Sequence, residues 1–357
     1  DWVNEEEFST ARSLEFNADN TMLAWVRYDE RKVPVYSMTE YKGLAPEHKE
    51  YEEYPGEYEY KYPVAGATNS KVSVMTFDIK NRVTRTMKLP IDSTGYVPRI
   101  KFTADPNRLA VVTLNRTQND MRIYMANPRS TECRLSLQET SDKYVKESAY
   151  TDLHFYGDHF AMISDRSGYR HIYGYDEKTG RFYYAANPDG PQYKAVYSTD
   201  LKGKTKRLTE KKGTNDATFS RSMKYFMNVF SDHDTPPVTT LCDNSGRTLA
   251  TLVDNKTLSQ KLAGKTGTKE FFTFTTSEGV QLNGWMVKPA DFDPNKKYAV
   301  VLYQYSGPGS QEVRDAWNMG FMPGALFESY MAERGVLFAC VDGRGTGGRG
   351  ADFEKCT

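Results

Sequence analysis

The chain has 357 residues, enough for two domains, and its 47 lysines and arginines balance its 47 aspartates and glutamates, so the formal net charge is zero. No run of like charge favours a nucleic-acid or membrane-surface partner, and no stretch reaches the ~18 apolar residues of a membrane-spanning helix. Tyrosine (25) outnumbers phenylalanine (18) and only 38% of the residues are hydrophobic, which favours many short, half-buried strands over a thick helical core.

The four cysteines, Cys133, Cys242, Cys340 and Cys356, are widely spaced and form no CxxC pair. We expect buried or free thiols, with one disulfide as the alternative. The sequence predicts no metal site and no cofactor, because no two histidines stand at helical ligand spacing. The chain lacks a signal peptide and does not begin with methionine, so we do not expect residue 1 to be the natural N-terminus.

Residues 1–267 form a series of short predicted strands separated by turns. One pattern recurs: an aromatic strand residue, a turn, an apolar strand, another turn and a strand that ends in a β-branched residue and a tyrosine. Four copies reach that last pair at Val35-Tyr36, Ile123-Tyr124, Ile172-Tyr173 and Val196-Tyr197. A fifth runs from ATFSRSMKYFMNVF into PPVTTLCDN.

The spacing of these copies favours a β-propeller. From Phe16 to Phe102 the distance suits two repeats of about 43 residues, within the ~40–50 residues of a four-stranded blade. A β-sandwich also has regular short strands, but it is not expected to repeat an aromatic signature at that length.

Two segments interrupt the repeat. Residues 37–70 are polar, tyrosine-rich and non-repeating, which predicts an arm or extended loop inserted within a blade. The spacing from Phe155 to Phe182 is too short for a full blade, so we expect residues to be missing between Tyr173 and Gly174, with the two residues far apart in space.

From residue 268 to 357 the pattern changes to that of an α/β sheet. KEFFTFTTSEGVQLNGWMVKP predicts a hairpin with its turn at residues 277–279. YAVVLYQY and VLFACVD read as strands buried on both faces, and FMPGALFESYMAERG between them reads as a helix. Strand, helix and strand predict the start of an α/β domain, with the boundary between residues 267 and 268.

This second segment contains no complete hydrolytic site. No GxSxG nucleophile elbow occurs in the chain, so no nucleophile, acid or base is assigned. All five histidines precede residue 268, and we expect each of them to be structural: His48, His154, His159, His171 and His233.

Two loops follow the predicted buried strands. Tyr305 stands at a strand end in YQYSGPGSQ, where a phenol could donate a hydrogen bond to an oxyanion, although a packing role is the simpler interpretation. The glycine-rich loop 342–350 fits neither GxxxxGK[ST] nor GxGxxG, and we interpret it as a mobile loop with an ion-paired arginine.

The opening DWVNEEEF places three carboxylates in a row. Such a run can be a solvated helix start, with acids near the positive end of the dipole. Paired carboxylates facing a cavity would instead bind an ammonium group through charge-assisted hydrogen bonds.

These motifs occur together, in the same order, in one family. DWVNEEEF resembles the double-glutamate motif of the dipeptidyl peptidase IV family, YSGPGSQ its Y-x-G-P-x-S-Q loop and DGRGTGGRG its D-G-R-G-[ST]-G loop. SGYRHIY is similar to a propeller stretch of the same proteins, and the wording of the two loops resembles the bacterial, Bacteroidetes-type branch. The resemblance covers essentially the whole chain and implies part of an eight-bladed propeller followed by the first strands of an α/β-hydrolase domain.

The resemblance implies roles for three residues. Glu6 and Glu7 would bind the free α-amino group of a peptide, and Tyr305 would supply its hydroxyl to the oxyanion. The family's serine, aspartate and histidine lie beyond residue 357, and an arginine of an earlier blade would precede residue 1. A second substrate-side pair near residues 143–150 has no secure counterpart.

The implied activity is that of a serine exopeptidase. It would release N-terminal dipeptides, with proline or alanine at the second position, from peptides with a free N-terminus. A tripeptidyl-releasing relative and a non-catalytic binding protein that has lost its serine remain alternatives. The resemblance also implies a periplasmic or secreted homodimer whose arm at 37–70 takes part in dimer contacts.

Overall fold

The computed structural model describes residues 2–41, 54–156, 159–166, 168–169, 171–174, 181–200, 203–220, 223–317 and 326–357. It divides into two compact units, Asp1–Asp176 and Glu177–Thr357. The boundary predicted at 267/268 lies inside the second unit, where the kind of sheet changes, and as a domain boundary it stays a prediction.

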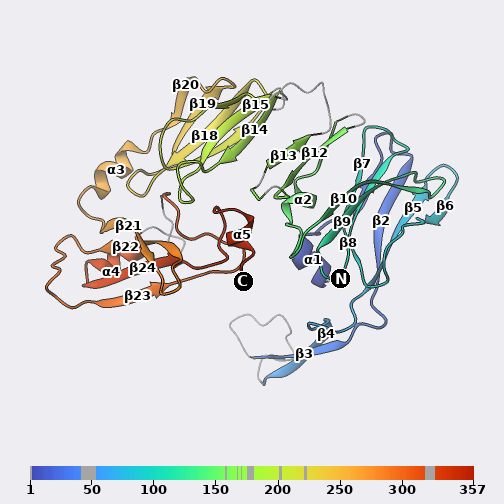
Figure 1. Cartoon of the computed structure of the whole chain (residues 1–357), viewed down its shortest axis with the longest axis horizontal. Helices are drawn as coiled ribbons and strands as arrows, with labels where there is room; N and C mark the ends of the chain where they lie inside the picture. The colour runs from blue at the N-terminus through green and yellow to red at the C-terminus, as the bar shows by residue number, and fades with distance from the viewer. Residues whose placement is uncertain are drawn as a thin grey trace. The chain divides into compact units, whose positions relative to one another are not determined.

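The first unit consists mainly of antiparallel sheets (Figure 1). It opens with helix α1 (Trp2–Phe8). The first sheet, in the order β1-β2-β5-β6, is formed by β1 (Leu14–Phe16), β2 (Met22–Asp29), β5 (Lys71–Asp78) and β6 (Val83–Thr86). The second is formed by β7 (Tyr96–Phe102), β8 (Leu109–Leu114), β9 (Asp120–Ala126) and β10 (Cys133–Thr140). Helix α2 (Ser148–Thr151) precedes the third, formed by β11 (His154–Tyr156), β12 (His159–Ser164) and β13 (His171–Gly174).

Successive sheets pack face to face through alternating apolar residues. Along β5 every second residue is buried, and Val74 packs with Met22 of the same sheet and with Val97, Leu109 and Val111 of the next. All six residues of β8 are buried, because this strand contributes to the cores on both of its faces. Meandering sheets stacked in chain order are the blades of a β-propeller, as predicted.

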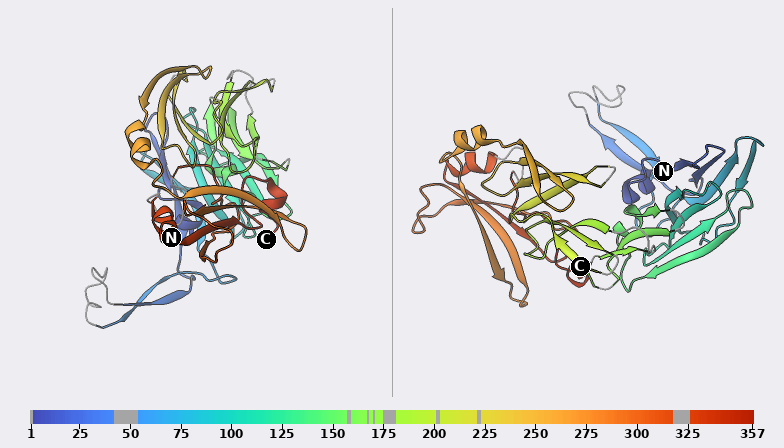
Figure 2. Two further views of the ribbon diagram at one scale, coloured as in Figure 1. Left: turned by 90° about the vertical axis from the view of Figure 1, so that its left-hand side faces the viewer. Right: turned by 90° about the horizontal axis from the view of Figure 1, so that it is seen from above.

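An arm interrupts the first blade. β3 (Val35–Glu40) and β4 (Gly56–Lys61) form a two-stranded hairpin between β2 and β5, which pair with each other across it. The hairpin extends away from the four-stranded sheets of its unit (Figure 2). The predicted insertion at 37–70 is therefore confirmed, with residues 42–53 outside the described part of the chain.

Two predictions made from the repeated sequence pattern are wrong because of this inserted hairpin. Val35-Tyr36 does not end the third strand of a blade, because it begins the hairpin and β5 takes that place in the sheet. Only one complete sheet lies between Phe16 in β1 and the end of β7 at Phe102, so that spacing is one blade lengthened by an insertion and not two blades.

For the other copies of the pattern, the predicted position on the third strand of a sheet is correct in two cases and wrong in one. Ile123-Tyr124 in β9 and Ile172-Tyr173 in β13 each lie on the third strand of their sheet, as predicted. Val196-Tyr197 lies on the second strand of its sheet, since the strand that contains Phe182 pairs directly with it. The pattern predicted one strand too many there.

The backbone is continuous where a break was predicted. Tyr173 and Gly174 are consecutive residues of β13 and pair with Met162 and Ala161 of β12. The predicted separation of the two residues is therefore wrong. In the described residues the sheets on either side of 175–180 have three strands each, so a shortening of the repeat here stays a prediction.

The second unit begins with two more antiparallel sheets and ends with a mixed one. The first is formed by β14 (Arg181–Ala186), β15 (Ala195–Asp200) and β16 (Thr205–Arg207). The next is formed by β17 (Thr214–Phe219), β18 (Tyr225–Ser231), β19 (Val238–Asp243) and β20 (Thr248–Val253), and α3 (Lys256–Leu262) follows it. The mixed sheet, in the order β21-β22-β24-β23, contains β21 (Thr268–Thr275), β22 (Gln281–Lys288), β23 (Ala299–Tyr303) and β24 (Val336–Asp342), with helices α4 (Phe327–Ala332) and α5 (Ala351–Glu354).

The mixed sheet matches most of the α/β prediction. β21 and β22 form the predicted hairpin, and β23 and β24 are parallel neighbours with α4 between them in the chain. β24 is largely buried, but β23 is not: Val300 is 56% and Leu302 64% exposed. The prediction of a strand buried on both faces was wrong for β23, because in the described residues neither face of this strand is covered along most of its length. β23 is also an edge strand of the sheet in these residues.

His233 joins the last antiparallel sheet to the segment before α4. Its ring nitrogen Nδ1 lies 2.8 Å from Oδ1 of Asp315, and its backbone N–H donates to the same oxygen. Asp315 in turn accepts a hydrogen bond from Thr214 through its backbone carbonyl. The pKa of His233 is raised, chiefly by the hydrogen bond to Asp315 and further by the charges of Asp234 and Asp232, against the opposing effect of burial. This histidine has a structural role, as predicted.

We expect the stability of the chain to fall as His233 loses its proton. A raised folded-state pKa means that the stabilisation is fully present below pH ~6.5 and is lost as the pH rises through the raised value. Replacing Asp315→Asn should therefore reduce the difference in urea unfolding midpoint between about pH 6 and pH 8. Equal pH dependence in the two proteins would show that His233 does not couple folding to protonation.

Candidate functional site

Helix α1 presents three glutamates to solvent because its other residues anchor it. Asn4 and Phe8, four residues apart and so on one face of the helix, are each only 2% exposed. Glu5, Glu6 and Glu7 lie between them and are exposed. The exposure of all three is thus a consequence of where the two buried residues stand.

The C-terminal end of α1 is firmly capped. The backbone N–H of Thr10 donates to the carbonyl of Glu5 and its hydroxyl donates to the carbonyl of Asn4. Ser9 follows the helix with a left-handed φ of 50°, a common way for a helix to end. Arg99 of β7 donates from Nη1 to the carbonyl of Phe8 at 2.6 Å. These bonds satisfy carbonyls that a helix end leaves without partners.

The helix dipole has a different effect on Glu5 than on the other two glutamates. Glu5 stands in the first turn of this seven-residue helix, where a negative charge is favoured. Glu6 and Glu7 stand in its last turn, at the negative end of the dipole. A solvated helix start therefore explains Glu5 but not the other two.

Glu7 lies beside an aromatic and cationic cluster. Phe8 packs edge-on against Tyr150 at a ring-centroid distance of 6.0 Å, and the Arg99 guanidinium lies 5.9 Å from the same ring. The pKa of Tyr150 is raised by burial first and then by the negative charges of Glu147 and Glu7. Burial lowers the pKa of Arg99. Arg99 was not singled out from the sequence, although it stands as an arginine inside the largely apolar strand YVPRIKF. Tyr150 ends the segment 143–150, in which no counterpart of the family's substrate-side pair was assigned.

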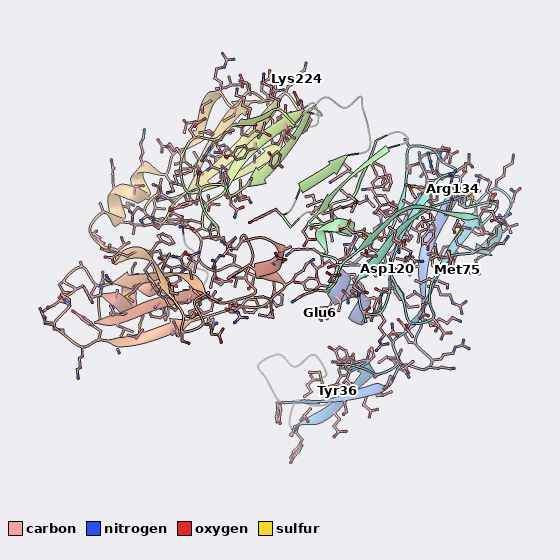
Figure 3. The ribbon with its side chains drawn as sticks, in the orientation of Figure 1. Glu6, Tyr36, Met75, Asp120, Arg134 and Lys224 are labelled. Carbon is pink, nitrogen blue, oxygen red and sulfur yellow. The ribbon has the colours of Figure 1, made fainter. Side chains whose placement is uncertain are left out.

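Glu6 lies toward the arm. Figure 3 labels Glu6 on α1 and Tyr36 on the hairpin. The pKa of Tyr60 in β4 is raised by partial burial, by the neighbouring tyrosines and by the charge of Glu6. The two adjacent glutamates thus influence different aromatic groups within the first unit.

Tyr305 lies in the second unit, on the loop that follows β23. Its side chain is 62% exposed, and its backbone carbonyl accepts a hydrogen bond from the Ser310 hydroxyl at 3.1 Å. In the part of the chain that the structure describes, no hydrogen bond is recorded for the Tyr305 hydroxyl. The ring is therefore largely exposed, and its place is set by the loop backbone.

The loop 342–350 lies against the Tyr305 loop. Arg344 pairs with Glu278 through Nη1 and Oε2, so the predicted ion-paired arginine is confirmed. Asp342, only 7% exposed, accepts the backbone N–H groups of Glu312 and Val313 at 2.8 and 3.1 Å. Burial raises the pKa of Asp342.

Cysteines and possible metal ligands are further groups that could carry chemistry. All four cysteines are free thiols, which agrees with the simpler expectation, and burial raises the pKa of Cys340 to about 12. Among the described residues no three His, Cys, Asp or Glu side chains gather as a metal site would need. No helix in the described ranges is long and apolar enough to cross a membrane.

Comparison with known proteins identifies relatives for the whole chain. The family model of the dipeptidyl peptidase IV N-terminal region matches residues 1–178 and 172–237, two matches that overlap at residues 172–178. The dipeptidyl peptidase 4 of Trichophyton rubrum is 27% identical over 399 residues, covering 99% of this chain and 50% of the relative. That of Trichophyton tonsurans has the same identity and coverage. The chain thus spans about half the length of the curated relatives it matches.

One solved structure is closely similar. The crystal structure of Porphyromonas gingivalis dipeptidyl peptidase 4 superimposes with a TM-score of 0.90 and 40% sequence identity, covering 100% of this chain and 52% of that chain.

Proposed function

The chain belongs to the dipeptidyl peptidase IV family, and on this basis we propose that the protein containing it releases dipeptides from the free N-terminus of peptides. The observation that carries the proposal is the pair of adjacent exposed carboxylates, Glu6 and Glu7, in the last turn of the capped helix α1. The helix dipole does not favour two negative charges there, and a bound ammonium group would compensate both of them.

The ligand is the protonated α-amino group of the substrate. Two carboxylates can each accept a charge-assisted hydrogen bond from one ammonium group. The family resemblance implies that an amine held by Glu6 and Glu7 leaves no room for a further residue beyond it, so that the bond that is cut lies two residues away. We extend the proposal to proline or alanine at the second position, as the family resemblance implies.

Tyr305 is proposed to assist the chemical step. A phenol at the end of a parallel strand can donate to the oxygen that becomes negative when a nucleophile attacks the peptide carbonyl. The sheet β21–β24 would then be the start of an α/β-hydrolase domain. Residues 1–357 contain no GxSxG sequence, so the nucleophile, acid and base are not assigned to them.

Residues 1–357 by themselves should not hydrolyse a glycyl-prolyl chromogenic amide, because no nucleophile elbow is present. The full-length gene product should cleave that amide and should reject its N-acetylated form, in which the amine carries no charge. The measurement is the initial rate of each protein on both substrates.

The outcome also separates the alternatives. Cleavage of tripeptidyl but not dipeptidyl amides would indicate the tripeptidyl-releasing relative, and binding without turnover would indicate a non-catalytic protein. Serine-dependent turnover by residues 1–357 would contradict the expectation that these residues are inactive by themselves. A periplasmic or secreted location and a homodimer complete the proposal; they rest on the family resemblance, and cell fractionation and sedimentation velocity test them.

A further inference from the structure

Two loops leave the same end of the mixed sheet. β23 and β24 are parallel neighbours, and Tyr303 at the end of β23 is paired with Cys340 near the end of β24. The loop that follows β23 carries Tyr305, and the loop that follows β24 begins at Asp342. Because parallel strands end at the same edge, the two loops are adjacent.

Backbone hydrogen bonds join the middle of the two loops. The N–H of Gly309 donates to the carbonyl of Gly345 at 2.9 Å, and the N–H of Gly347 donates to the carbonyl of Ser310 at 2.8 Å. The Ser310 hydroxyl lies 2.6 Å from the carbonyl oxygen of Gly307 and 3.1 Å from that of Tyr305, so its one proton goes chiefly to Gly307. Hydrogen bonds therefore connect Gly347, through Ser310, to the first residues of the loop that carries the phenol.

The two ends of the Tyr305 loop are fixed from the same side. Near its start, the hydroxyl of Ser306 accepts the N–H of Gly343 at 3.2 Å. Beyond its end, the Asp342 carboxylate accepts the N–H groups of Glu312 and Val313. Contacts from the 342–347 segment thus hold the chain that directly follows Tyr305, from Ser306 to Val313.

Gly347 approaches the Tyr305 loop too closely for any side chain. A Cβ added to it would lie 2.8 Å from the carbonyl oxygen of Gly309, a backbone atom that cannot rotate away. The φ of Gly347 is not in the positive range, so alanine is excluded by this contact and not by backbone conformation.

We propose that Gly347 and Asp342 are positioning residues for Tyr305: they set where its hydroxyl stands relative to the developing oxyanion. The inference rests on the proposed function. The exposed ring has no recorded hydrogen bond from its hydroxyl among the described residues, so the loop backbone determines its place. Oxyanion stabilisation needs donors 2.7–3.1 Å from the oxygen, and a misplacement of about 1 Å can cost ~10²-fold in rate.

The test is a double-mutant cycle in the full-length enzyme. Gly347→Ala should lower kcat roughly 10- to 100-fold with little change in KM, because the loop must shift. In a Tyr305→Phe background the same substitution should have less than about a threefold effect, because the hydroxyl that it displaces is already absent. Asp342→Asn, which keeps the shape of the side chain but not the charge, should behave in the same way if Gly347→Ala does not fold.

Gly267 provides a matched control. A Cβ on Gly267 would also lie 2.8 Å from a backbone carbonyl oxygen, that of Lys288, at the start of β21 and with no positive φ. Gly267→Ala should lower the unfolding temperature but leave the kcat of the folded enzyme unchanged. Equal losses of kcat from Gly347→Ala in the wild-type and Tyr305→Phe backgrounds would overturn the inference alone. An unchanged kcat in Tyr305→Phe would overturn the proposed role of Tyr305, and the inference with it.

Discussion

Replacing Tyr305→Phe in the full-length enzyme is expected to lower kcat by about 10²–10³-fold with almost no change in stability. The substitution keeps the ring and removes only the hydroxyl. Because the ring is 62% exposed and no hydrogen bond of its hydroxyl is recorded among the described residues, folding loses nothing when the oxygen is removed. The transition state loses one hydrogen-bond donor, and a donor of this kind contributes several kcal/mol.

Tyr303 serves as the control for this prediction. It stands two residues earlier, at the end of β23, and its hydroxyl interacts with Glu312. Tyr303→Phe should cost about 1 kcal/mol of stability and leave kcat within a few-fold of the wild type. Steady-state kinetics and thermal unfolding of both variants check the pair of expectations. A normal kcat in Tyr305→Phe would return Tyr305 to a packing role.

The parts of the fold that were predicted correctly depend on local patterns. The β21–β22 hairpin follows from alternating residues around the turn at 277–279, and the blades follow from short strands separated by turns. The errors arise where pairing is not local. β2 pairs with β5 across the whole arm, and nothing in Val35-Tyr36 distinguishes the start of an arm from the third strand of a blade.

Burial of β23 was mispredicted for a related reason. Its apolar composition is typical of a strand covered on both faces, and composition reports what a strand can tolerate in the complete sheet. Which residues are actually covered depends on the neighbours present, and in the described residues β23 has β24 on one side only.

In the candidate site, too, the residues in continuous motifs were predicted and those in long-range contacts were missed. Glu6, Glu7 and Tyr305 were found because each lies in a continuous motif. Arg99 was missed because its contact with the carbonyl of Phe8 joins residues 91 positions apart. Only the packing of α1 on β7 and α2 shows that Arg99 and Tyr150 contact Phe8, the last residue of the helix that carries the glutamates.

Glu6→Gln and Glu7→Gln should each lower kcat/KM for a free-amine dipeptide substrate by roughly 10- to 150-fold. Losing one partner of a charge-assisted hydrogen bond to the substrate ammonium costs about 1.5–3 kcal/mol, which gives this range. Glutamine retains the shape of glutamate and its carbonyl oxygen, so the loss measures the charge and not the packing. The measurement is kcat/KM of the full-length enzyme on a glycyl-prolyl amide.

Glu5→Gln is the matched control, since it makes the same change one residue earlier on the same exposed surface of α1. Glu5 stands in the first turn, where its charge is favoured by the dipole, so its loss should reduce stability by a few tenths of a kcal/mol and leave kcat/KM almost unchanged. Glu6 and Glu7 stand in the last turn, where the dipole disfavours a carboxylate, so their replacement should leave stability unchanged or slightly higher while activity falls. If Glu6 and Glu7 bind the amine, replacing either of them lowers kcat/KM without lowering stability, whereas replacing Glu5 lowers stability without lowering kcat/KM. Small and equal losses of kcat/KM at all three positions would leave the solvated helix start as the only explanation of the run of glutamates.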